Sequence, residues 1–88
     1  MTVVLEARVD LVGIQDLHSS ITQAYDGGAD LLLDGRAVER IDGAGLQLLT
    51  SLFLTAKEDG RKVAWLDASR ELRDAASHLG LLEALDLA

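Results

Sequence analysis

The sequence has no cysteine and no proline among its 88 residues, and aromatic residues make up only 3%. The lack of cysteine excludes disulfides, thiolate metal ligands and cysteine nucleophiles, and the lack of proline excludes a Pro-rich linker. Basic residues are also few, with 8 Lys and Arg against 15 Asp and Glu, which gives a net charge of −7. A chain this acidic is repelled by phosphate backbones and anionic lipid surfaces, so we expect no nucleic acid and no membrane surface as partner.

Long hydrophobic runs are absent as well. Short ones such as 31–33 cannot span a bilayer, and the N-terminus lacks the basic and apolar regions of a signal peptide. Hydrophobic residues are nonetheless 49% of the chain and charged residues 26%, as in an ordinary globular domain. We therefore expect one soluble, cytoplasmic domain that covers residues 1–88.

The spacing of the apolar residues predicts the secondary structure. Alternation from Val3 to Leu11 predicts a half-buried strand, or two short strands in a hairpin. Helical periodicity predicts helices over 14–25 and 42–59 and a third helix that Ser69 caps and Gly80 ends. Short apolar segments predict strands over 29–34 and 62–67, the first of them buried on both faces. Residues 35–41 are expected to form a charged loop, and residues 81–87 a short final helix.

Strands and helices therefore alternate along the chain. Strand 29–34, helix 42–59 and strand 62–67 form a βαβ unit, which makes its two strands parallel. This order predicts the α/β class.

The segment from Glu39 to Leu46 is the candidate functional site. It follows a parallel strand and opens a helix, where open α/β sheets place their functional loops. Asp42 is expected to be the N-cap and to accept a hydrogen bond from the backbone of Ala44 or Gly45. The small residues after it leave the first helical turn bare, so a large partner could approach the backbone. A well-capped helix whose glycines permit close packing is the competing interpretation.

One side chain on this helix departs from the amphipathic pattern. Leu54 lies in the middle of the polar face that Gln47, Ser51 and Glu58 form, and an exposed leucine there can contact a partner. The candidate partner-binding residues are thus Arg40, Asp42, Gly43, Ala44, Gly45, Gln47 and Leu54.

No catalytic, metal or cofactor site is expected. Gly43-Ala44-Gly45 begins like a dinucleotide fingerprint, but the third glycine position holds Leu48, and no P-loop motif occurs. His18 and His78 stand alone on different predicted helices, without partners at ligand spacing. Without a nucleophile–base pair, the protein is not expected to be an enzyme.

Three segments resemble the STAS domain family, which is named for sulfate transporters and anti-sigma-factor antagonists. Residues 31–46 resemble the family's LxLDLSxVxFIDSSGL segment, with Asp42-Gly43-Ala44-Gly45-Leu46 at its end. Residues 59–66 resemble its next strand, and residues 72–81 its VxxxLxxxGL helix. The resemblance implies a small α/β domain with a mixed sheet and helices packed mainly on one face.

The resemblance also implies a bacterial protein–protein interaction module. Antagonists of this family bind an anti-sigma kinase, and phosphorylation of the hydroxyl residue after the loop aspartate breaks the complex. Here that position is Gly43, and no Ser or Thr occurs from 23 to 49. The resemblance thus implies an interaction without a switch in this loop, with an anti-sigma kinase or with a chemosensory or two-component protein. The alternative is an accessory subunit of a lipid-transport ABC system that binds its ATPase.

Overall fold

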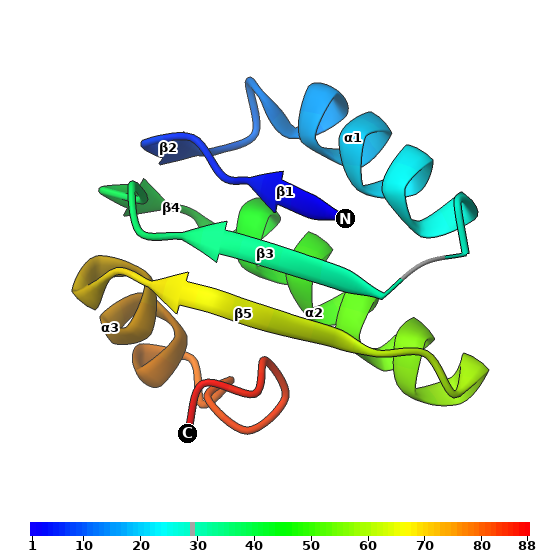
Figure 1. The fold of residues 1–88 in the computed structure, drawn as a ribbon. Helices are drawn as coiled ribbons and strands as arrows, with labels where there is room; N and C mark the ends of the chain where they lie inside the picture. The colour runs from blue at the N-terminus through cyan, green and yellow to red at the C-terminus, as the bar shows by residue number, and fades with distance from the viewer. Residues whose placement is uncertain (29) are drawn as a thin grey trace.

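The computed structural model describes residues 1–28 and 30–88. Its elements are, in chain order, β1 (Thr2–Val4), β2 (Arg8–Val9), α1 (Ile14–Asp26), β3 (Leu31–Gly35), β4 (Arg40–Ile41), α2 (Gly43–Asp59), β5 (Val63–Ala68) and α3 (Arg70–His78). The α/β class is confirmed (Figure 1). The expected charged loop contains a short strand, β4, and Ala29, where the second predicted strand begins, lies outside the described residues.

The strands form two parallel sheets. Three strands pair in the order β1-β3-β5, and β2 pairs with β4. A hairpin over residues 3–11 is therefore wrong, because β1 and β2 each pair with a later strand. Every described pair is parallel rather than mixed, since a helix lies between each strand and its partner along the chain.

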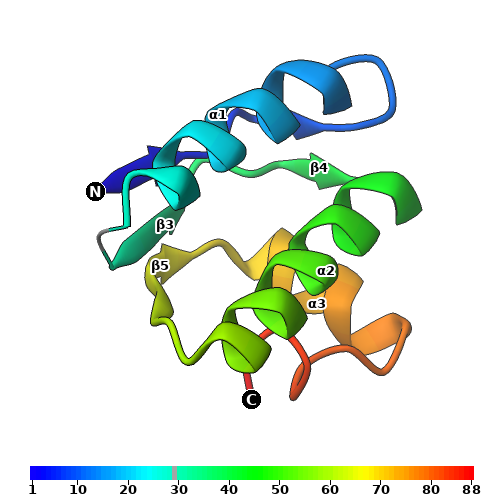
Figure 2. The ribbon, with the colours of Figure 1, turned by 90° about the vertical axis from the view of Figure 1, so that its right-hand side faces the viewer.

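Helices α1 and α2 cover the same face of the three-stranded sheet, as expected (Figure 2). The opposite face is open, and Val4, Leu32 and Leu66 are exposed on it. Burial of the second predicted strand on both faces is therefore wrong, because Leu32 is 38% exposed where no helix covers it. The core lies between the sheet and the helices, and its fully buried large side chains are Leu5, Leu31, Leu33, Leu49, Leu72, Leu85 and Val38.

The helix boundaries follow the predicted signals. Gly60 ends α2 in the left-handed conformation, with φ of 69°. Ser69 caps α3, where its hydroxyl accepts a hydrogen bond from the Leu72 backbone N–H at 3.1 Å. In the described part of the chain, no helix combines the length and the apolar character needed to cross a membrane.

The C-terminal segment forms turns instead of the expected helix. Asp86 has a positive φ of 57°, which interrupts helical geometry, and the turns bury Leu85 and Leu87. The indole N–H of Trp65 on β5 donates to the Leu85 carbonyl at 2.7 Å, and its ring stacks on Phe53 of α2 at 6.0 Å between centroids. The need to bury the two leucines against the core thus overrides the local helical pattern.

Candidate functional site

Asp42 joins two segments of the chain at the N-terminus of α2. Its Oδ1 accepts a hydrogen bond from the Gly45 backbone N–H at 3.0 Å, which confirms the predicted N-cap. Its Oδ2 accepts a second hydrogen bond from the backbone N–H of Leu11, also at 3.0 Å. The Asp42 backbone N–H in turn donates to the Val9 carbonyl at 3.1 Å. One residue therefore fixes the first turn of α2 against the segment that follows β2.

These bonds set the charge state of the site. The hydrogen bond from Gly45, and then the one from Leu11, stabilise the carboxylate and hold the pKa of Asp42 below its ordinary value of 3.8. Partial desolvation of the carboxylate raises the pKa, but its effect is smaller than that of the hydrogen bond from Gly45. Asp42 is thus an anion at neutral pH, and its negative charge lies at the positive end of the α2 dipole.

The two glycines after Asp42 have opposite environments. A Cβ at Gly43 would meet no atom within 4 Å, and Gly43 has no positive φ. A Cβ at Gly45 would lie 2.7 Å from Val9 Cγ1, 2.8 Å from the Val9 carbonyl oxygen and 3.0 Å from Ile41 Cγ1. Each of the two interpretations therefore holds for one glycine. Gly43 is exposed and open to a partner, whereas Gly45 permits close packing of α2 on the strands, is buried and cannot contact a partner.

The other candidate residues lie around this turn and along α2. Arg40 is exposed on β4, Gln47 is exposed on α2, and Ala44 is half-buried. Leu54 is 54% exposed, on the polar face where the helical spacing predicts it. We call the exposed surface formed by Arg40, Asp42, Gly43, Gln47, Ser51 and Leu54 the α2 surface.

The sequence did not point to the turn between β2 and α1. Leu11 and Val12 are 69% and 93% exposed, and the Asp42–Leu11 hydrogen bond places them beside the first turn of α2. The alternation from Val3 to Leu11 suggested that Leu11 faces the core. No local pattern indicates that the strand ends at Val9, because that end follows from the pairing of β2 with the distant β4.

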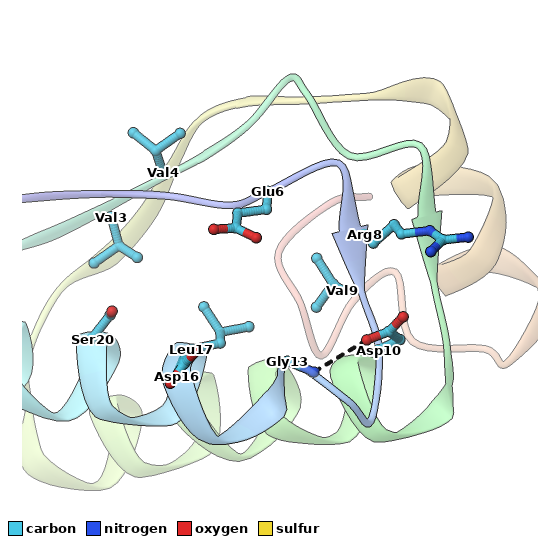
Figure 3. A pocket seen from close by; sticks show the side chains of 10 residues that line it. All are labelled: Val3, Val4, Glu6, Arg8, Val9, Asp10, Gly13, Asp16, Leu17 and Ser20. Carbon is cyan, nitrogen blue, oxygen red and sulfur yellow. Dashed lines mark hydrogen bonds between the residues drawn. The ribbon is translucent and has the colours of Figure 1, made fainter.

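A cavity of about 120 Å³ lies between β1, β2 and α1 (Figure 3). Its apolar wall includes Val3, Val9 and Leu17, and Asp10 at its edge accepts a hydrogen bond from the Gly13 backbone N–H at 3.2 Å. None of the candidate residues from the sequence lines it. The cavity has about the volume of a few water molecules, which is below the usual size of a ligand pocket.

The two histidines lie apart, His18 on α1 and His78 at the end of α3, and both are exposed. Within residues 1–28 and 30–88, no group of three or more His, Cys, Asp or Glu side chains is arranged to hold a metal ion.

Comparison with known proteins identifies the family. No curated protein matches the chain. A family model described as "Mlab, STAS domain" matches residues 1–86, which is nearly the whole chain. The parallel strands, the helices on one face and the aspartate-capped α2 at the end of a strand agree with that match. The chain therefore belongs to the STAS domain family.

Proposed function

We propose that the protein is a non-catalytic interaction module that resembles anti-sigma-factor antagonists and binds a regulatory protein through the α2 surface. STAS domains generally mediate protein–protein interactions. The partner class that we favour is an anti-sigma kinase or another bacterial signalling protein, which places the protein in the cytoplasm.

Gly43 is the observation that carries the proposal. It lies in the first turn of α2, with open space around it, at the position where the family's antagonists carry a phosphorylated hydroxyl. A glycine there has nothing for a kinase to modify. The complex would therefore lack a phosphorylation switch at this loop, where a phosphate would add about −1.5 to −2 charge.

The next hydroxyl residues along α2 do not replace the missing one. The Thr50 hydroxyl donates to the Leu46 carbonyl at 2.8 Å within the helix. Ser51 is exposed, but it lies two helical turns beyond Gly43. Neither side chain occupies the first turn, where charge would oppose docking.

Affinity purification of the tagged chain from its native cell, with mass spectrometry, tests the proposal. The purified partner is then titrated with wild-type protein and with Leu54→Ala and Gly43→Glu. Both substitutions should leave the fold intact, because Leu54 is exposed and Gly43 has room for a side chain. Both should weaken the complex, the first by removing an apolar contact and the second by placing an unpaired carboxylate in the interface.

Gln23→Ala is the matched control, since Gln23 is exposed on α1, a different helix from the one that carries Gly43 and Leu54. Folded variants that bind with wild-type affinity would refute docking through the α2 surface. Recovery of an ABC ATPase in place of a signalling protein would keep the docking surface but select the alternative function, an accessory subunit of a lipid-transport system.

A further inference from the structure

Arg40, which belongs to the α2 surface, has a second arginine beside it. In the parallel β2–β4 pair, Arg8 is the direct register partner of Arg40, and Val9 is that of Ile41. Figure 3 shows the Arg8 side chain extending toward β4. Neighbouring strands are about 4.8 Å apart, so the two arginine side chains leave the strand pair from adjacent positions.

Both arginines point away from the core. A Cβ at Gly45 would contact both Val9 and Ile41, so these two side chains face α2. Successive residues of a strand alternate between its faces, so Arg8 and Arg40 share the opposite, solvent-exposed face.

Among the residues that the structure describes, no carboxylate forms a salt bridge with either arginine. The salt bridges among the described residues join Arg36 to Asp34 and Arg70 to Asp74. Arg36, by contrast, is paired with a carboxylate, because its guanidinium group donates to both Asp34 oxygens at 3.0 and 2.9 Å. Arg8 and Arg40 form no such pair, although the chain has 15 Asp and Glu. Like charges in register destabilise a sheet, so the pair costs stability in the free protein.

We propose that Arg8 and Arg40 together bind a carboxylate-bearing segment of the protein partner, an inference that rests on the proposed function. Guanidinium groups match carboxylates in geometry and hold them with paired N–H···O bonds. β4 leads directly into Asp42, so Arg40 lies at the N-terminal end of the α2 surface and Arg8 extends that surface onto β2. Binding of an acidic segment would relieve the repulsion between the two arginines.

The occupant is a short acidic segment rather than a nucleic acid or an anionic membrane. The protein has a net charge of −7, so residues outside the arginine pair repel an extended polyanion. A few carboxylates on an otherwise neutral or basic partner avoid that penalty, because exposed charges farther apart than about 8–10 Å are largely screened.

The test follows the side-chain Nε–Hε NMR signals of the arginines during titration with a capped peptide that has two adjacent glutamates and two lysines, and therefore no net charge. We expect saturable shifts for Arg8 and Arg40 and none for Arg70, which already has a partner. The double variant Arg8→Gln/Arg40→Gln should bind the peptide about tenfold more weakly, as the loss of two exposed charge pairs predicts. The variant Lys62→Gln, which also loses an exposed positive charge, should bind as wild type does.

Thermal unfolding of the same variants gives an independent readout. The single variants Arg8→Gln and Arg40→Gln should be at least as stable as the wild type, because each removes the repulsion. A loss of stability in both would show that the arginines serve the fold and would overturn the inference. The inference would also fall if the two-glutamate peptide left both signals unshifted. Equal shifts with inorganic phosphate or with phosphatidylglycerol vesicles would likewise overturn the assignment to an acidic segment.

The experiments distinguish a failure of the arginine inference from a failure of the proposed function. If the partner complex is weakened by Gly43→Glu and Leu54→Ala but not by the arginine variants, the inference falls and the proposed function stands. If the arginines bind the two-glutamate peptide while neither Gly43→Glu nor Leu54→Ala affects a partner complex, the proposed docking through α2 falls.

Discussion

Gly45→Ala tests the packing of α2 on β2, which positions the whole candidate site. The added methyl group would lie 2.7 Å from Val9 Cγ1 and 2.8 Å from the Val9 carbonyl oxygen. The second atom is backbone and is held in place, because the Val9 carbonyl accepts the hydrogen bond from Asp42. The substitution therefore has to move either the helix or the strand.

The expected size of the effect follows from two opposing contributions. Overpacking of a close contact costs about 1–3 kcal/mol, and replacing glycine by alanine in a helix returns up to about 1 kcal/mol. With the full offset, the net loss is about 0–2 kcal/mol, which corresponds to a melting temperature lower by up to about 15 °C in a domain of this size. Gly43→Ala is the matched control two residues away. It has open space and should raise the melting temperature slightly, by a few degrees at most.

Thermal unfolding followed by circular dichroism, with urea denaturation as a second measurement, compares the two variants with the wild type. A Gly45→Ala protein that melts with or above the Gly43→Ala protein would refute the packing argument. It would mean that β2 yields to the methyl group at little cost, so that the first turn of α2 is not held rigidly against the strand.

Three further predictions concern charge, modification and catalysis. The pKa of Asp42 lies below its ordinary value of 3.8, so its stabilising effect is fully present well above that value and is lost as the pH falls through the lower folded-state pKa. Asp42→Asn should therefore weaken the acid dependence of the urea midpoint at pH values below about 5, and an unchanged dependence would contradict the hydrogen-bond assignment. Kinases that modify other antagonists should add no phosphate to residues 35–49, and phosphopeptide mapping that finds Thr50 or Ser51 modified with release of the partner would refute a complex without a switch. The protein should not turn over nucleotides or esters above a buffer blank, and an activity that His18→Ala or His78→Ala abolishes would contradict this.

The elements that local signals define could be predicted from the sequence. Asp42 and Gly60 mark the ends of α2, and Ser69 marks the start of α3, because capping depends on residues within a turn of each other. The exposed position of Leu54 likewise follows from helical spacing alone.

The features that depend on distant contacts could not be predicted in this way. β4 has only two residues, and it is a strand because β2 lies beside it. The second hydrogen bond of Asp42 needs Leu11, which is distant in sequence, and the register of Arg8 with Arg40 follows from the same long-range pairing. The C-terminal turns form because two leucines reach the core there, which a helix-forming composition does not reveal.

Trp65 gives the protein its own optical reporter. It is the single tryptophan of the chain, and it contacts both α2, through Phe53, and the C-terminal turns, through the Leu85 carbonyl. Its emission should therefore change when either contact opens, and a displacement of α2 on docking would be visible without any attached dye. Stopped-flow fluorescence at this one residue can then time partner binding and folding in the same unlabelled sample.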